Sequence, residues 1–523
     1  MSACRLLSFL LCIVFGTGCM LDAQGASNPA GEQIAPHRYI VVYRDGAVPG
    51  DAATRIQRLG GHLVRPQPRF GIAAVQTFAH TERSRIAASS PSMTGTATEE
   101  QFLRDLTAQP DVALVLHDRI VTAHRLRVRA IPDPVFSVAV GAATFDTYYN
   151  SPQGWAVRQV GGFGANIPGG PAQGPWDTTR GKGVRIAILD SGVDETHPDI
   201  APNLALNLSD VNPGELPSVC DDGSPQDQDG HGTWTASLAA AALGPGTGKT
   251  VGVAPSATLL NIKVLERLPA ATGADDNARC NAGEASGLLS WVIQGVEDAI
   301  ANHADVISMS LGTMLDLSTG DGAGTKAVFD RISYAAAQAG AVLVAAAGND
   351  ATNLSNPRYV EIPAQSRGVL AVVADTNPDC MENISAGSTC VAGPPSLAYY
   401  SNYGVPLNAV AAPGGSYPSG GEMEISGWVR GACSSGLPGT VSGVPSDAAH
   451  SFGCFDLGHV PYVQAIGTSA SAPLVAGAAA LLRAAHPDWD AAAVIAALRS
   501  TASPASASLP YPQVDLTSAL SPQ

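Results

Sequence analysis

Short apolar runs alternate with segments of helical pattern from about residue 153 to residue 519. The apolar runs have the composition of parallel strands that are buried on both faces, and they are Val184–Leu189, Thr258–Val264, Val306–Ser310, Val342–Ala346 and Leu370–Val373. The helical segments are His231–Leu243, Ser286–His303, Gly324–Gln338 and Ser469–Ala485. This alternation predicts an α/β fold with a doubly wound, mostly parallel sheet, in which loops at the carboxyl ends of the strands form the site.

A smaller α+β unit is predicted ahead of that body, over residues 36–124. Its strands and helices are expected in the order Tyr39–Tyr43, Ala52–Leu59, Phe70–Thr77, Glu99–Ala108 and Val112–Val121. Residues 125–152 follow as a junction, which opens on the basic run Arg125–Arg129 and continues with Pro132 and Pro134.

The first 25 residues have the pattern of an export signal. Arg5 precedes the apolar run Leu6–Gly16, which is too short for a stable membrane span. Cleavage before Ala26 predicts a secreted protein with no transmembrane span in the mature chain. The alternative is a lipid-anchored bacterial envelope lipoprotein attached through Cys19, although Gly16 stands where that pattern has Leu, Val or Ile.

Charge is scarce and unevenly distributed, with 14% charged residues and a net charge of −16. Residues 1–130 contain 14 basic and 10 acidic side chains, which gives +4, so the remainder carries −20. Opposite net charges predict that the two parts attract each other. The acidic larger part argues against nucleic acid as a partner.

Nine cysteines fit an exported protein, and three of them lie in or beside the signal. The other six allow about 15 pairings, among which the sequence cannot choose. Short loop closures favour Cys380–Cys390, Cys433–Cys454 and Cys220–Cys280. A zinc site is the competing interpretation, but neither a Cys-x-x-Cys sequence nor a paired histidine spacing supports it.

Four short motifs carry the candidate chemistry. Residues 185–194 read Arg-Ile-Ala-Ile-Leu-Asp-Ser-Gly-Val-Asp, 229–233 read Asp-Gly-His-Gly-Thr, 345–349 read Ala-Ala-Ala-Gly-Asn and 467–473 read Gly-Thr-Ser-Ala-Ser-Ala-Pro. The serine of the last motif opens an apolar helix, where unpaired backbone N–H groups can build an oxyanion site beside a nucleophile. The lack of any Gly-x-Ser-x-Gly sequence argues against an α/β-hydrolase.

Together these motifs resemble the subtilase family of serine proteases, peptidase family S8, in which Asp, His and Ser occur in this order. The resemblance implies a subtilisin-like fold and a serine endopeptidase with Asp190, His231 and Ser469 as its triad. Asp190 would orient His231, His231 would be the general base toward Ser469, and Asn349 would donate to the oxyanion. Taken singly, each residue has a structural explanation, such as a turn or a helix cap.

The resemblance also implies where a peptide substrate would lie. An extended substrate would add as a strand beside Ala285, Ser286 and Gly287. The pocket for the side chain before the cleaved bond would be walled by Ser310, Leu311, Gly312, Ala346, Ala347 and Gly348. These small walls predict a roomy, mostly apolar pocket and a preference for an aromatic or large aliphatic side chain.

The resemblance covers nearly all of residues 180–500, within a peptidase domain expected over 153–519. Insertions interrupt it at 208–228, 266–284, 376–397 and 415–462. Residues 36–124 resemble the inhibitor-type propeptide of subtilases, which leaves its C-terminal end in the active-site cleft. We therefore expect a self-processed zymogen with its own propeptide as intramolecular inhibitor, cut within about 122–150; an unrelated accessory domain is the alternative.

No cofactor is expected for catalysis, and the expected active site holds no metal. A structural Ca2+ site is one interpretation of the acidic loop before His231, which contains Asp221, Asp222, Asp227 and Asp229. A solvated acidic loop is the other interpretation. We expect a monomer that acts on protein and peptide substrates, and two alternatives stay open: a catalytically inactive subtilase-fold binding protein, and an esterase.

Overall fold

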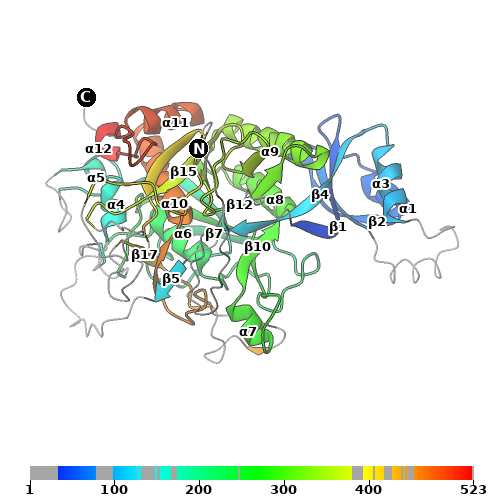
Figure 1. Cartoon of the computed structure of the whole chain (residues 1–523), viewed down its shortest axis with the longest axis horizontal. Helices are drawn as coiled ribbons and strands as arrows, with labels where there is room; N and C mark the ends of the chain where they lie inside the picture. The colour runs from blue at the N-terminus through cyan, green and yellow to red at the C-terminus, as the bar shows by residue number, and fades with distance from the viewer. Residues whose placement is uncertain are drawn as a thin grey trace, which may run out of the picture.

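A large helix-and-sheet body and a smaller N-terminal unit lie side by side (Figure 1). The computed structural model describes residues 33–77, 98–124, 127–130, 148–149, 154–165, 173–244, 248–379, 393–404, 407–416, 427–436, 440–441, 444–445 and 453–520. The predicted pair Cys380–Cys390 and the predicted signal over residues 1–25 lie outside the described residues.

A seven-stranded sheet, in which all neighbouring strands are parallel, forms the centre of the large body. Its strand order is β16-β15-β13-β11-β6-β8-β7. In chain order the strands are β6 (Arg185–Asp190), β7 (Leu204–Ser209), β8 (Thr258–Lys263), β11 (Val306–Met309), β13 (Val342–Ala346), β15 (Val369–Asp375) and β16 (Ala409–Pro413). The predicted doubly wound, mostly parallel sheet is therefore confirmed.

Both faces of this sheet are buried, because alternate residues of each strand enter two different cores. Ile186 and Ile188 of β6 belong to the core under α6 (His231–Ala240) and α10 (Thr468–Ala485). Ala187 and Leu189 belong to the core under α8 (Leu289–Ala301) and α9 (Gly320–Gln338). Burial on both faces explains why the strands appear in the sequence as continuous apolar runs.

Two edge strands and two helix starts differ from the sequence prediction, and one of these helices, α9, begins at Gly320 instead of Gly324. β7 and β16 were not predicted, because β7 is half-buried and β16 is only five residues of small side chains and Pro. The predicted helix Ser286–His303 begins later, at Leu289, because Glu284–Leu288 forms strand β10. The backbone of Ser286 pairs with both Glu266 and Thr122, so this residue belongs to a sheet and not to a helix.

The N-terminal unit is an antiparallel sheet in the order β4-β1-β3-β2, with two helices packed on it. Its core includes Val41, Ile56, Phe102 and Leu106. The elements are β1 (Ile34–Tyr43), α1 (Ala52–Leu59), β2 (Gly61–Gln67), η1 (Pro68–Phe70), β3 (Ile72–Thr77), α3 (Glu99–Thr107) and β4 (Val112–Ala123). The five predicted elements are present, and β2 is the strand that the sequence pattern missed.

Strand β4 is longer than predicted and connects the two units. Its first half pairs with β1, and its last residues pair antiparallel with β10 on one side and β12 (Leu311–Asp316) on the other. In Figure 1, β4 runs from the N-terminal unit into the large body and ends between β10 and β12. With β9 (Glu266–Leu268) and β14 (Tyr359–Ile362), these strands form one eight-stranded sheet.

A buried charge network fastens the N-terminal unit to the large body. The Arg38 guanidinium donates to Asp118 Oδ2 at 3.3 Å and to Glu215 Oε2 at 2.8 Å. Asp118 also accepts from the backbone N–H and hydroxyl of Ser290, at 3.0 and 2.6 Å, in the first turn of α8. Arg65 donates to Asp210 at 3.0 Å. The basic N-terminal unit thus meets carboxylates supplied by insertion 208–228, as the charge distribution predicted.

The remaining elements are shorter and lie outside the two large sheets. A three-stranded antiparallel sheet has the order β17-β20-β5. The elements are β5 (Arg127–Ala130), α4 (Trp155–Gln159), α5 (Pro175–Thr178), α7 (Asp276–Asn281), β17 (Val429–Ala432), β18 (Thr440–Val441), β19 (Val444–Pro445), β20 (Tyr462–Ile466), α11 (Ala491–Ser500) and α12 (Leu516–Ala519). Among the described helices, none has the length and apolar character that crossing a membrane requires.

Candidate active site

Asp190 and His231 form a buried pair at the carboxyl end of β6. His231 Nδ1 lies 2.7 Å from Asp190 Oδ1, and both side chains are almost fully buried. Asp190 accepts two further hydrogen bonds, from the Ser191 N–H at 2.7 Å and from the Thr235 hydroxyl at 3.1 Å. Because these donors fix the carboxylate, it can hold the imidazole in one orientation with its Nδ1 position protonated.

The other ring nitrogen of His231 is left available for proton transfer. Within the described residues, His231 Nε2 is buried and has no hydrogen-bond partner. Burial opposes a charge on His231, but Asp190, Asp229 and Asp227 outweigh it and raise the pKa of His231 above its ordinary value. A buried nitrogen with a raised pKa and no partner is suited to accept a proton from a nucleophile.

Ser469 lies in the first turn of α10, directly after β20. The Ser469 hydroxyl donates to the backbone carbonyl of Ser310 at 3.4 Å, and the Ser310 hydroxyl donates to the Ser469 carbonyl at 3.1 Å. Among the described contacts, Ser469 therefore faces the end of β11 and is not hydrogen-bonded to His231. The helix start supplies backbone N–H groups beside the hydroxyl, as the motif predicted.

Asn349 is positioned by the residue that precedes Ser469. Asn349 Oδ1 accepts from the Thr468 N–H at 2.9 Å and from the Thr468 hydroxyl at 2.8 Å. This use of the oxygen directs the amide NH2 group away from Thr468. The Thr468 hydroxyl also accepts from the Gly348 N–H at 3.2 Å, so the loop after β13 and the start of α10 hold each other.

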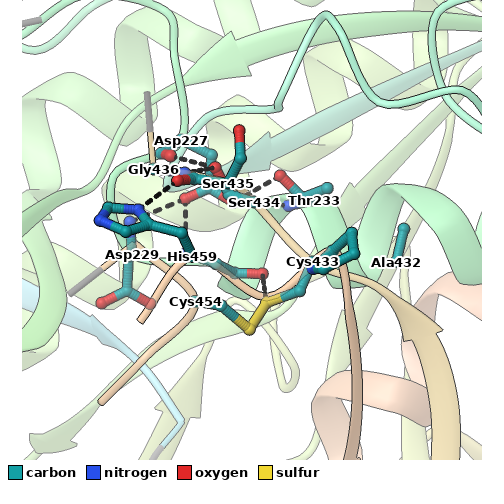
Figure 2. The surroundings of a disulfide bond; sticks show 12 residues. Asp227, Asp229, Thr233, Ala432, Cys433, Ser434, Ser435, Gly436, Cys454 and His459 are labelled. Atoms are coloured by element: carbon teal, nitrogen blue, oxygen red, sulfur yellow. Dashed lines mark hydrogen bonds between the residues drawn. A yellow bond between two sulfur atoms is a disulfide. The ribbon is translucent and has the colours of Figure 1, made fainter. Parts of the chain in front are cut away.

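A disulfide supports the turn in front of His231 (Figure 2). Cys433 Sγ lies 3.8 Å from the Gly230 carbonyl, and a Cβ atom built on Gly230 would lie 2.9 Å from that sulfur. Gly230 also has φ +105°, so both its conformation and its surroundings require glycine. Asp227 accepts from the N–H and hydroxyl of Thr233 and thus holds the first turn of α6.

Two of the predicted disulfides are confirmed, Cys220–Cys280 and Cys433–Cys454. Their Cα–Cα distances are 5.4 and 5.6 Å, in the normal range. The competing zinc interpretation is wrong for these four cysteines.

The acidic loop before His231 is occupied by protein donors. Asp221 forms a buried ion pair with Lys263 at 2.8 Å, and Asp229 pairs with Arg267 at 3.0 Å. Asp222 accepts from Gln228, and Asp227 holds α6 as described above. Across the described residues, no three His, Cys, Asp or Glu side chains gather into a group that could hold a metal ion. The calcium interpretation of these four aspartates therefore finds no support in their contacts.

The predicted substrate strands hold the end of β4. Gly287 pairs with Val121 and Ser286 with Thr122, while Gly312 and Leu311 pair with Thr122 and Ala123. Ala285 is buried and pairs with Arg267 of β9, so it does not contact β4 by strand pairing. The cleft that the sequence assigned to a substrate is thus filled by the chain's own strand.

A pocket with polar and charged side chains in its lining lies at the end of β4. His124, the residue after β4, is buried beside Gly312, Gly348 and the backbone of Ala346. Glu361, from β14, also reaches this pocket, and its Oε1 lies 3.8 Å from His124 Nε2. Gly312 is the predicted wall residue that lines this pocket, and Glu361 lines it as well. Glu361 was not named from the sequence, because it lies in a strand without any motif.

Comparison with known proteins agrees with this architecture. Residues 181–517 match the model of the subtilase family. Subtilisin NAT of Bacillus subtilis subsp. natto is 33% identical over 324 residues, which cover 62% of this chain and 61% of that relative. The matched part thus spans about three fifths of this relative's length. The chain belongs to the subtilase family.

Two solved structures share the fold over nearly the whole chain. Fervidolysin from Fervidobacterium pennivorans, described as a keratinolytic enzyme related to subtilisin, has a TM-score of 0.59 at 20% identity. The likeness covers 94% of this chain and 62% of fervidolysin. The epidermin leader peptide processing serine protease from Staphylococcus aureus has a TM-score of 0.58 at 18% identity, covering 92% of this chain and 97% of that one.

Proposed function

We propose that the protein is a serine endopeptidase of subtilisin type. The observation that carries this proposal is the 2.7 Å hydrogen bond between Asp190 and His231, which leaves the other ring nitrogen buried without a partner among the described residues. Membership of the subtilase family supports the same activity. Protein and peptide chains are the proposed substrates.

In the proposed reaction, the Ser469 hydroxyl attacks the carbonyl carbon of the cleaved peptide bond, and His231 Nε2 takes its proton. Asp190 keeps the imidazole in the required tautomer and stabilises its charged form. The Asn349 amide and the Ser469 N–H would stabilise the oxyanion. His231 then protonates the leaving amine, and water hydrolyses the acyl-enzyme by the reverse proton transfers. No cofactor takes part in these steps.

We further propose that residues 36–124 are an inhibitory propeptide and that the chain is a self-processed zymogen. The last residues of β4 occupy the strand positions of a substrate, which supports intramolecular inhibition. β5 then pairs with β20, which ends three residues before Ser469. Secretion, with the signal over 1–25, and a monomeric mature enzyme complete the proposal.

Mass spectrometry of three expressed chains tests this proposal. The wild type should lose its N-terminal unit by cleavage, whereas Ser469→Ala should stay uncleaved. Ser471→Ala is the matched control, because Ser471 is buried in the same helix turn and should process normally. If Ser469→Ala is processed at the wild-type rate in the purified state, the nucleophile is assigned wrongly.

The oxyanion donor has a separate test. Asn349→Ala should keep the fold and lose about 100- to 1,000-fold in kcat on a peptide substrate. Near-wild-type turnover would contradict its role.

A further inference from the structure

The end of the N-terminal unit lines a pocket beside Gly312 and Glu361. Ile120, Thr122 and His124 all line this cavity of about 360 Å³, because alternate residues of a strand point to the same side. Val121 and Ala123 lie on the other side, in the apolar core. His124 is the last of the three, and its ring lies near the backbone of Ala346.

The wall opposite His124 is acidic. Glu361 and Asp350 line the cavity together with the small polar residues Thr313 and Thr352. Glu361 is 2% exposed, and a Cβ atom on Gly312 would lie only 2.0 Å from its Oε1 and 2.8 Å from His124 Cε1. Glycine at this wall is therefore what allows a carboxyl group and an imidazole to share the pocket.

Within the described residues, Glu361 has no cationic neighbour besides His124. Their closest approach is 3.8 Å, between Glu361 Oε1 and His124 Nε2. His124 Nε2 is itself buried and has no hydrogen-bond partner among the described atoms. Burial, with a smaller contribution from Asp350, raises the pKa of Glu361 well above its ordinary value. Burial also lowers the pKa of His124 to about 4, so this carboxyl lacks a strong partner in the uncleaved chain.

We propose that Glu361 makes this pocket selective for a basic side chain before the cleaved bond, and that the chain's own cleavage follows His124. This inference rests on the proposed peptidase function. An aliphatic or aromatic side chain would bury the Glu361 carboxyl without a partner, and sites with unpaired buried polar groups discriminate strongly. A Lys or Arg side chain would instead pair with the ionised carboxylate.

The position of His124 relative to the strands agrees with cleavage at its carbonyl. Thr122 pairs with both β10 and β12, and Ala123 pairs with β12. The next described residues, from Arg127, pair with β20. In the proposed step, Ser469 Oγ forms a bond to the His124 carbonyl carbon. The bond from that carbon to the Arg125 nitrogen breaks, and His231 transfers the serine proton to this nitrogen. Water then releases His124 as a carboxylate and regenerates Ser469.

A peptide panel on the processed enzyme tests the selectivity. The peptides are identical except for Lys, Arg, His, Leu or Phe before the cleaved bond. We expect higher kcat/KM for Lys and Arg than for Leu and Phe. Glu361→Gln should reduce the ratio of Lys to Leu by about 10- to 100-fold. Glu195→Gln is the matched control, because this exposed carboxylate, bound to Asn207, lies outside the described lining of the cavity.

Two further measurements keep the outcomes distinct. Glu361→Asp retains the charge and should keep the preference for Lys over Leu even if kcat falls. Labelling of Ser469 by a fluorophosphonate shows whether each variant has a working site. If a wild-type preparation that reacts with the label prefers Leu or Phe before labelling, or if the ratio is unchanged in a Glu361→Gln preparation that reacts with the label, the selectivity is overturned. A released fragment that ends anywhere except His124 overturns the cleavage position. An enzyme that neither reacts with the label nor cuts any peptide overturns the proposed function itself.

Discussion

Replacing Asp118 with asparagine should weaken the hold of the N-terminal unit on the catalytic body. Asp118 is fully buried in the interface. It receives a charged donor from Arg38 at 3.3 Å and two donors from Ser290 at 3.0 and 2.6 Å. Asparagine keeps the size of the side chain, but it loses the negative charge and replaces one acceptor oxygen with a donor. In at least one of these contacts, the asparagine NH2 group then faces another hydrogen-bond donor.

The magnitude follows from the partners that remain. Arg38 and Asp118 belong to the same unit, so the contacts of Asp118 that cross the interface are the two hydrogen bonds from Ser290. A hydrogen bond to a charged group contributes about 1.5–3 kcal/mol. Both bonds are weakened, while Arg38 keeps its 2.8 Å contact with Glu215 across the interface, so the total loss is about 3 kcal/mol. A loss of about 3 kcal/mol corresponds to roughly 150-fold weaker binding of the cleaved N-terminal unit.

Recovery of activity on dilution measures this binding. The freshly processed complex is diluted in steps, and the concentration at half-maximal peptidase activity reports dissociation of the N-terminal unit. Asp118→Asn should raise that concentration by roughly 150-fold. Glu100→Gln on α3, whose side chain is 85% exposed, should leave it unchanged. A shift below about threefold for Asp118→Asn would show that the charge network contributes little, as exposed ion pairs do.

The pH profile and the disulfides give two more predictions. The pKa of His231 is raised and the general base must be neutral, so kcat/KM should fall as the pH drops through a value above the ordinary 6.5. A midpoint below 6.5 would contradict the conclusion that Asp190 and the neighbouring carboxylates outweigh the effect of burial on this pKa. Removing the Cys433–Cys454 disulfide by double Ser substitution should cost about 3 kcal/mol of stability and also lower kcat, because it supports the turn before His231. The same change at Cys220–Cys280 should affect stability in denaturant melts while kcat stays near wild type.

The sequence allowed the layout of the fold to be predicted because the parallel strands are buried on both faces. Runs such as Val342–Ala346 are apolar at every position, and the structure has the same bounds for β13. The helix after Ser286 was placed too early for a physical reason. The sequence pattern predicted a helix from Ser286, but the backbone of residues 284–288 pairs with β4 and β9, whose paired residues lie 16 or more positions away in the chain. Pairing partners of that kind leave no trace in local periodicity.

The candidate site likewise combines residues that motifs predicted with residues that the sequence pattern missed. Asp190 and His231 were recognised by their motifs, and the structure brings them together at 2.7 Å. Glu361 has no motif, and a carboxylate in a strand is ordinarily read as an exposed residue. Similarly, the sequence left Asp221 open as a calcium ligand or a solvated residue, because its partner Lys263 lies 42 positions further on. Long-range charge partners decide the role of a carboxylate, and a single sequence does not display them.

One final perturbation separates the two anchors of β4, the charge network at Asp118 and the pocket at His124. Inserting one alanine between Arg119 and Ile120 leaves both anchors in the chain but makes their spacing one residue too long. If Asp118 sets the register, every later side chain moves to the opposite face of the strand. Val121 and Ala123 would then enter the polar pocket, and Thr122 would enter the apolar core.

That inversion would bury polar groups without partners, at about 1–3 kcal/mol for each group. A bulge at the inserted alanine would instead disturb the ladder at one position and keep the pairings of Thr122 with Ser286 and Gly312. We therefore expect the bulge, with the released fragment of the inserted variant still ending at the original His124 when its mass is measured. A fragment ending at Ala123 would mean that Asp118 fixes the register of β4 more strongly than the cleft does. Because the bulge lies close to Asp118, it should also weaken the inhibitory complex. The insertion should therefore leave the cleavage position unchanged while it weakens inhibition.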